Sequence, residues 1–177
     1  MTTVVPKSDP VREVLLVAHP GRRDIEDTAR RVCNVFEEAG IQLRVLTDEV
    51  DTTRIESQDT GRDVQSDLRV NVVDFGPNAA VGCELVLVLG GDGTFLRAAE
   101  VAQAAGIPVL GINLGRIGFL AEAEADHLED ALARVVGHDY RIEERMTLDV
   151  TIRVGDRVVE RGWALNEASI ENGSRLG

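Results

Sequence analysis

Apolar and polar residues follow one another along the first part of the chain in blocks typical of a parallel sheet. A continuous apolar run, VLLVA at 14–18, has the pattern of a strand that is buried on both faces. Apolar residues from Ile25 to Ala39 then recur at helical spacing, and Gly40 follows as a C-terminal stop. Residues 41–46 supply a second strand. This order of strand, helix and strand is the unit that builds a parallel sheet.

The same pattern returns after a long polar stretch. Residues 51–69 are almost entirely polar and charged, which predicts an exposed loop. The strongest strand of the chain, ELVLVL at 84–89, leads through a glycine-rich segment into a helix that begins near Thr94 and ends at Gly106. The next strand is predicted at 107–112.

The period of the pattern changes in the last quarter of the chain. A further helix, with Leu128 and Leu132 on its apolar face, stops at Gly137. From Met146 onward apolar and polar residues alternate, and the dipeptide 155–156 (Gly-Asp) forms a two-residue turn between two strands. This hairpin indicates that a second, antiparallel unit begins near residue 140.

The fold class predicted is therefore α/β, with an open, mostly parallel sheet, flanking helices and the start of an antiparallel β-rich domain. We expect a flexible tail at 1–10, the α/β domain at 11–140 and the beginning of a truncated β-rich domain at 141–177. About 35 residues are too few for an independent sandwich. Apolar hairpin residues such as Leu148 and Ile152 would then stay exposed to water, which costs about 25 cal/mol for each Å² of apolar surface. We expect the 177-residue chain alone to be weakly active or inactive and to associate with itself.

Composition excludes several classes of protein. The 177 residues carry a net charge of −12, which argues against a protein that coats nucleic acid or anionic membrane. Lys7 is the only lysine, so a P-loop of the GxxxxGK[ST] type is excluded. Apolar runs fall far short of the roughly 20 residues of a membrane helix, and residues 1–10 lack the features of a signal peptide, which predicts a cytoplasmic protein. Cys33 and Cys83 have no CxxC partner and are expected to be small buried hydrophobes.

The segment GGDGT at 90–94 is the main candidate for chemistry. It follows a buried strand and opens a helix, so it lies at the carboxyl edge of the sheet, where ligands of such sheets bind. Its glycines let the backbone approach a ligand, and the helix adds the positive end of a dipole, which together favour phosphate. A dinucleotide fingerprint would need a third glycine where Leu96 stands. The alternative is a tight turn in which Asp92 only caps the helix.

Three segments in succession resemble the motifs of NAD kinases. They are GGDGTFLRAA at 90–99, GINLGRIGFLAE at 111–122 and the pair NE at 166–167 after the hairpin. Diacylglycerol and sphingosine kinases share GGDGT, and phosphofructokinases carry a close variant of it. The second segment makes the resemblance more specific to NAD kinases. The resemblance covers roughly residues 11–171.

This resemblance implies transfer of a phosphoryl group to the 2′-hydroxyl of the adenosine ribose of NAD, which gives NADP. Asp92 would face that hydroxyl as the general base. The donor would be ATP or inorganic polyphosphate, used with Mg²⁺ or another divalent metal, and the working protein a homo-oligomer, a dimer or a tetramer. No metal-ligating residue is assigned. The resemblance also implies the residues that hold the nucleotides: Gly91 and Gly93 at the phosphates, Arg97 near the nucleotide, Phe119 against the adenine, and Asn166 with Glu167 on the adenosine part.

Without the resemblance, most of these residues have plainer explanations. Phe119 is then a core residue, because only 3% of the residues are aromatic, while Arg97 and Glu167 are surface charges. His19, in the loop after the first strand, is then a structural loop residue. Two other functions compete with NAD kinase: a lipid kinase of the diacylglycerol type, and a nucleotide-binding module without catalysis. Hydrolysis by a nucleophilic serine and zinc proteolysis have no supporting motif.

Overall fold

The computed structural model describes residues 11–19, 23–47, 70–114, 120, 123–124, 127–165 and 167–169. The chain divides into two compact units, Met1–Tyr140 and Arg141–Gly177. The expected tail at 1–10 and the polar stretch at 51–69 lie outside the described residues.

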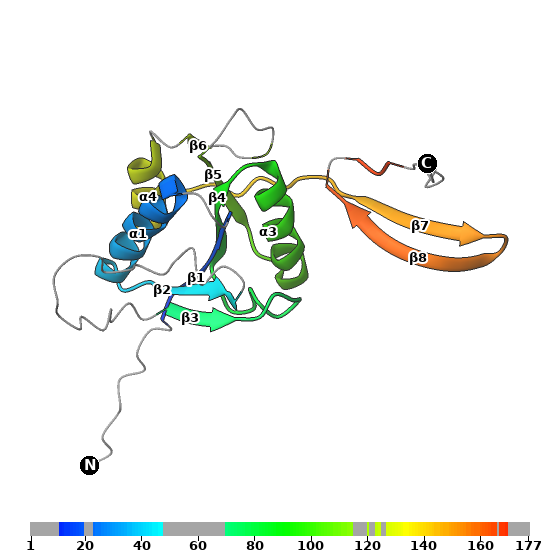
Figure 1. The fold of residues 1–177 in the computed structure, drawn as a ribbon, viewed down its shortest axis with the longest axis horizontal. Coiled ribbons are helices and arrows are strands. Elements are labelled where there is room, and N and C mark those ends of the chain that lie inside the picture. Colours follow the sequence, from blue (N-terminus) through cyan, green and yellow to red (C-terminus); the bar gives the residue numbers. More distant parts are fainter. Residues whose placement is uncertain are drawn as a thin grey trace, which may run out of the picture. The chain divides into compact units, whose positions relative to one another are not determined.

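The first unit is a three-layer α/β structure built on a parallel sheet (Figure 1). The strand order is β3-β2-β1-β4-β5-β6, and every neighbouring pair is parallel. The strands are β1 (Glu13–Ala18), β2 (Gln42–Leu46), β3 (Val70–Val73), β4 (Leu85–Gly90), β5 (Val109–Asn113) and β6 (Ala123–Glu124). The helices are α1 (Arg23–Glu38), α3 (Asp92–Ala105) and α4 (Leu128–Val136). The predicted fold class is confirmed.

The two central strands are buried on both faces. Every residue of β4 is buried, as is every residue of β1 after Glu13. Leu16 and Leu87 belong to the core on one face, while Leu15 and Val86 belong to the core on the other. This two-sided burial explains why both strands read as continuous apolar runs. Each buried Leu or Val side chain contributes about 1.5–3 kcal/mol through its removal from water.

Helices cover both faces of the sheet. α1 and α4 pack on one face and α3 on the other, as Figure 1 shows. The apolar stripe of α1, which includes Ile25, Ala29 and Phe36, is buried against the sheet. The helix stops at Gly40, whose φ of 70° is available to glycine at little cost. The predicted boundary is thus confirmed.

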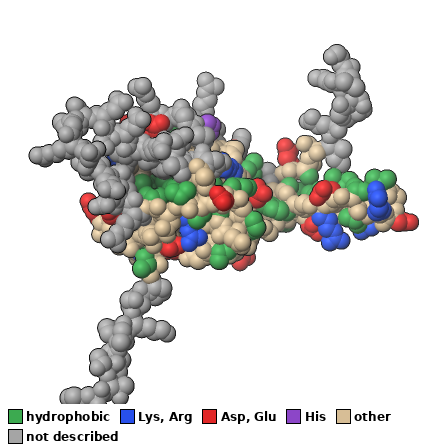
Figure 2. All heavy atoms as spheres, turned by 60° about the horizontal axis from the view of Figure 1, so that its bottom comes forward, with side chains coloured by type: hydrophobic (Ala, Val, Ile, Leu, Met, Phe, Trp, Pro, Cys, Tyr) green, Lys and Arg blue, Asp and Glu red, His purple; other side chains and the backbone are tan. Residues whose placement is uncertain are grey.

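The second unit is the predicted hairpin. β7 (Leu148–Val154) and β8 (Arg157–Ala164) pair antiparallel through a two-residue turn, in which Gly155 has a φ of 61°. A register shift between Ile152 and Arg153 marks a β-bulge that the alternating pattern does not predict. Apolar side chains of the hairpin are exposed beside basic and acidic ones (Figure 2), Leu148 to 42% and Ile152 to 52%.

Three local features differ from the expectation. β3 and β6 are absent from the sequence prediction, because β3 is a short edge strand directly after the polar stretch and β6 has only two residues. The left-handed residue after α4 is His138, with a φ of 53°, while Gly137 keeps a right-handed conformation. Histidine is among the residues that adopt this conformation more readily than most.

Both cysteines are free and buried, as predicted. Burial raises the pKa of the Cys33 thiol to about 11, and it also raises the pKa of Cys83. Within the described residues, no helix has the length and apolar character needed to cross a bilayer.

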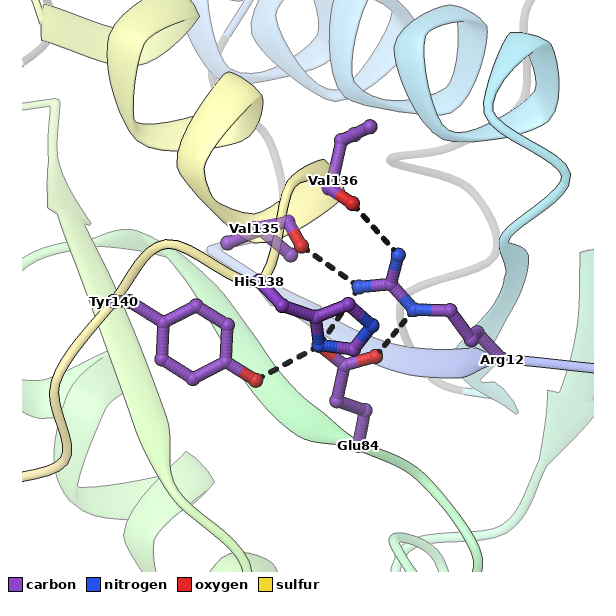
Figure 3. Close-up of polar contacts among 6 residues, drawn as sticks. All are labelled: Arg12, Glu84, Val135, Val136, His138 and Tyr140. Carbon is purple, nitrogen blue, oxygen red and sulfur yellow. Dashed lines mark hydrogen bonds and ion pairs between the residues drawn. The ribbon is translucent and has the colours of Figure 1, made fainter.

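A cluster centred on Arg12 closes the amino edge of the sheet (Figure 3). Its guanidinium donates two hydrogen bonds to the carboxylate of Glu84, from Nε at 2.7 Å and from Nη2 at 2.8 Å. It also donates to the carbonyl oxygens of Val135 and Val136 at 2.7 and 2.9 Å. These carbonyls end α4, and that of Val135 also accepts a hydrogen bond from the backbone N–H of His138 at 3.2 Å. Arg12 therefore joins the last turn of α4 to the start of the two central strands.

The Glu84 carboxylate also accepts a hydrogen bond from the Tyr140 hydroxyl at 2.8 Å. The hydrogen bonds from Arg12 lower the pKa of Glu84, and burial together with the bond to Glu84 raises the pKa of Tyr140 to about 12. Tyr140 is the last residue of the first unit, so the cluster also fixes the point at which the chain leaves that unit.

Replacing Glu84 with glutamine tests this cluster. The substitution removes the charge that faces Arg12, so the free energy of unfolding at neutral pH should fall by about 2 kcal/mol. The midpoint of thermal unfolding should then fall by about 4–8 °C. Because the folded-state pKa of Glu84 is lowered, its contribution is complete above the ordinary value of 4.5 and declines as the pH falls below it. Urea unfolding of both proteins across that range should show the difference narrowing with acidity.

The matched control is Asp27→Asn. Asp27 pairs with Arg30 on the surface of α1 and its side chain is 75% exposed. Its removal should change the stability by less than about 0.5 kcal/mol. An equal loss in the two variants would contradict the special role of the Arg12 cluster.

Candidate active site

The glycine-rich segment lies where the chain changes direction across the sheet. After β1 the chain continues to β2 on one side, and after β4 it continues to β5 on the other. The crevice outside the carboxyl ends of two such strands is the usual ligand site of open α/β sheets. The backbone N–H of His19 donates to the carbonyl of Leu89 at 3.1 Å. His19, the first residue after β1, is thus held beside Leu89, which directly precedes the glycine segment.

Gly90 is required by packing within the protein. A Cβ at this position would lie 2.6 Å from the hydroxyl oxygen of Thr94 and 2.9 Å from its Cβ. Thr94 is buried in the first turn of α3. Only glycine therefore lets this turn pack so closely on the end of β4.

Gly91 and Gly93 differ from Gly90. A Cβ at either position would meet nothing within 4 Å, and neither residue has a positive φ. Gly91 is the N-cap of α3, with φ −110° and ψ −167°, a conformation open to any residue. A tight turn therefore explains one of the three glycines, and within the described residues nothing requires the other two. Because Gly91 and Gly93 have no side chains, the first-turn N–H groups of α3 stay accessible. These groups have no carbonyl partner within the helix.

Asp92 does not cap its own helix. It is the first helical residue of α3, and the N-cap Gly91 has no side-chain cap. Its Oδ1 accepts a hydrogen bond from the backbone N–H of Leu120 at 3.1 Å, and the side chain is partly exposed. Leu120 belongs to the second of the three motifs. The Asp92 carboxylate thus links the first motif to the second at the carboxyl edge of the sheet.

Arg97 lies on the second turn of α3. Its guanidinium carbon is 5.0 Å from the centre of the Phe75 ring, which belongs to the segment after β3. This distance is within the range of a cation–π contact. Nothing in the local sequence pattern around Phe75 indicates a partner on a distant helix, so this residue is not among the predicted site residues.

Asn113, at the end of β5, was also missed as a site residue. It is the register partner of Gly90 and brings a polar side chain to the same edge. The signal that could have found it is its place at the end of a strand inside the second motif.

The remaining candidates lie outside the described part of the first unit. Phe119 and Asn166 lie outside the described residues, and Glu167 is an exposed residue of the second unit. In the described part of the chain, no three histidine, cysteine or acidic side chains converge on a possible metal site.

Comparisons with known proteins agree on one family. The sequence model of the ATP-NAD kinase N-terminal domain matches residues 14–140. The NAD kinase of Rhodococcus jostii is 70% identical over 169 residues, which are 94% of this chain and 53% of that protein. The NAD kinase of Mycobacterium tuberculosis is 58% identical over 167 residues, or 94% of this chain and 54% of that protein. The chain thus spans about half the length of these curated relatives.

The fold is shared with a solved structure. Yeast NADH kinase in complex with NADH superposes with a TM-score of 0.66 at 18% identity, covering 89% of this chain and 44% of that one. At this identity the likeness concerns the fold alone. Family membership follows from the match over residues 14–140, and the glycine segment with Asp92 lies inside that match. The chain belongs to the NAD kinase family.

Proposed function

We propose that the protein carrying this chain is an NAD kinase, which phosphorylates the 2′-hydroxyl of the adenosine ribose of NAD to give NADP. The observation that carries the proposal is the pair of glycines around Asp92, whose missing side chains nothing in the described protein requires. They flank a carboxylate at the N-terminus of α3, at the carboxyl ends of the neighbouring strands β1 and β4. Family membership supports the same reaction.

The reaction needs positioning more than strong proton abstraction. The ribose oxygen attacks the terminal phosphorus of the donor, the bridging P–O bond of the donor breaks, and the hydroxyl proton passes to the Asp92 carboxylate. Because the transition state of phosphoryl transfer is loose, the proton leaves late and a weak base suffices. The hydrogen bond from the Leu120 N–H holds one carboxylate oxygen in place. Asp92 then orients the ribose hydroxyl and accepts its proton.

The phosphates would lie at the N-terminus of α3. First-turn N–H groups and the helix dipole attract anions there, and Gly91 and Gly93 let a phosphate approach the backbone. The net charge of −12 repels a polyanionic substrate at long range, so local positive groups must offset it. Arg97 supplies a full positive charge on the same helix. Phe119, Asn166 and Glu167 complete the proposal as contacts of the adenosine part.

We further propose that Mg²⁺ or another divalent metal enters with the donor, which is ATP or polyphosphate. Magnesium is commonly held by substrate phosphates and one or two carboxylates, which fits a described chain without a three-ligand cluster. When bound, such an ion neutralises charge on the donor phosphates. A cytoplasmic homo-oligomer, a dimer or tetramer, is proposed as the working form, and the exposed apolar residues of the hairpin support association.

The decisive assay uses protein produced from its complete coding sequence. Incubation with NAD, Mg²⁺ and either ATP or polyphosphate should form NADP, and chelation of the metal should abolish the reaction. Phosphorylation of diacylglycerol without NADP formation would identify a lipid kinase instead. Binding of NAD without transfer from either donor would identify a binding module.

Asp92→Asn should lower kcat by about 10²-fold or more, because the amide cannot accept the hydroxyl proton. The affinity for NAD should stay within about tenfold, since the amide keeps the size and most of the hydrogen bonding of the carboxylate. Glu100→Gln is the matched control, an exposed acidic residue on the same helix whose neutralisation should leave kcat unchanged. Unchanged turnover in Asp92→Asn would exclude the role.

Gly93→Ala separates a structural role of the glycine from a ligand-binding one. There is room for the added Cβ, and alanine favours a helix over glycine, so the stability should rise by about 0.5–1 kcal/mol. The same methyl group would meet an approaching phosphate, so the KM for the donor or for NAD should rise about tenfold. Gly90→Ala should instead lower stability and activity together through its clash with Thr94. Unchanged KM values in Gly93→Ala would show that no phosphate lies there.

A further inference from the structure

Phe75 is a partly exposed aromatic residue at the same edge of the sheet as the glycine segment. Its side chain is 41% exposed, although the whole sequence contains only four phenylalanines. It lies two residues beyond Val73, the last residue of β3, and therefore at the carboxyl edge of the parallel sheet. Burial in the core does not account for this ring.

The segment that carries Phe75 is held on both sides. The hydroxyl of Thr47 lies 3.1 Å from the Val73 carbonyl and 2.8 Å from the Asp74 carboxylate, and its single proton is shared between these two acceptors. On the other side, Arg44 donates two hydrogen bonds of 2.9 Å, one to the carbonyl of Ala79 and one to that of Val81. The Phe75 ring thus stands on a fixed base and can orient what it touches.

The partner of the ring is the guanidinium of Arg97, 5.0 Å from the ring centre. Arg97 follows Gly93 by four residues, so the two lie on the same face of α3, and helical side chains lean toward the N-terminus. Gly93 has no side chain in that direction. Since Phe75 lies at the carboxyl edge, where α3 begins, the contact keeps the guanidinium at the N-terminal end of the helix.

Contact with an aromatic ring does not use up the hydrogen-bond donors of a guanidinium. The N–H donors of arginine lie in the plane of the group, while an aromatic ring stacks against that plane. Stacking also reduces the number of side-chain conformations, so less entropy is lost when a phosphate binds. An aromatic support therefore suits an arginine that must meet an anion in a fixed place.

We propose that Phe75 is a positioning residue, which holds the Arg97 guanidinium at the glycine segment for a phosphate group of NAD or of the donor. This inference rests on the proposed function, because it takes phosphate to be the ligand at the start of α3. Phe75 itself touches neither substrate in this account and acts only through Arg97.

The test compares Phe75→Leu, Phe75→Tyr, Arg97→Gln and the double variant Phe75→Leu/Arg97→Gln in protein produced from its complete coding sequence. Phe75→Leu should raise the KM for one phosphate-bearing substrate about three- to tenfold and leave kcat within about twofold. Phe75→Tyr keeps the ring and should stay within about twofold of the native protein. A rise in the KM of the donor assigns Arg97 to the donor phosphates, and a rise in the KM of NAD assigns it to the dinucleotide.

The double variant distinguishes positioning from simple packing. Arg97→Gln should raise the same KM at least as much as Phe75→Leu does, and adding Phe75→Leu to it should cause no further rise. Effects that multiply would overturn the proposal, as would unchanged KM values in Phe75→Leu. Phe75→Met, which keeps apolar volume without a ring, gives the same readout if the leucine variant does not fold.

Val81→Ala is the matched control, because Val81 is an apolar residue of the same segment and is 54% exposed. Its KM values should equal those of the native protein, and a rise equal to that of Phe75→Leu would overturn the special role of the ring. The two hypotheses fail separately. A native protein that forms no NADP refutes the proposed function, whereas NADP formation with an unaltered Phe75→Leu variant refutes only the role of Phe75.

Discussion

Burial of β1 and β4 on both faces is the constraint on which the rest of the first unit depends. Their apolar side chains project to both sides, so each face of the sheet needs a layer of helices. Right-handed crossovers that leave β1 and β4 in opposite directions supply one layer each. The glycine segment therefore lies at the carboxyl end of β4, where the paths of the chain diverge. The site of Asp92 is thus a consequence of how the core is covered.

The two edges of the sheet carry different chemistry. At the amino edge, Arg12 pairs with Glu84 and bonds to the end of α4. These two charges therefore stabilise the fold. At the carboxyl edge, one glycine serves packing, and two glycines leave the start of α3 accessible beside Asp92. This separation keeps the paired charges of the amino edge away from the groups to which we assign ligand binding.

The fold and the site were predictable to different extents. Strong local patterns located β1, α1, β4, α3 and the hairpin, because continuous apolar runs and helical spacing are properties of short segments. β3 and β6 were missed, since a short edge strand and a two-residue strand are defined by their neighbours. GGDGT made Asp92 a candidate for the same local reason, and its catalytic role stays a prediction. The contact of Asp92 with Leu120, 28 residues away, and that of Arg97 with Phe75 depend on tertiary packing, so no local pattern reveals them. The roles of Phe119 and Asn166 stay predictions.

Arg12 forms hydrogen bonds with residues far along the sequence, which are absent while the first strands are being synthesised. Its partners on α4 lie 123 and 124 residues further on, and the strand that follows it is one of the two central strands of the sheet. β1 therefore emerges from the ribosome long before β4 arrives to cover its open side. A growing chain carries that unpaired apolar edge until β4 (Leu85–Gly90) is made, in a unit that ends at Tyr140, and such a surface is prone to aggregation.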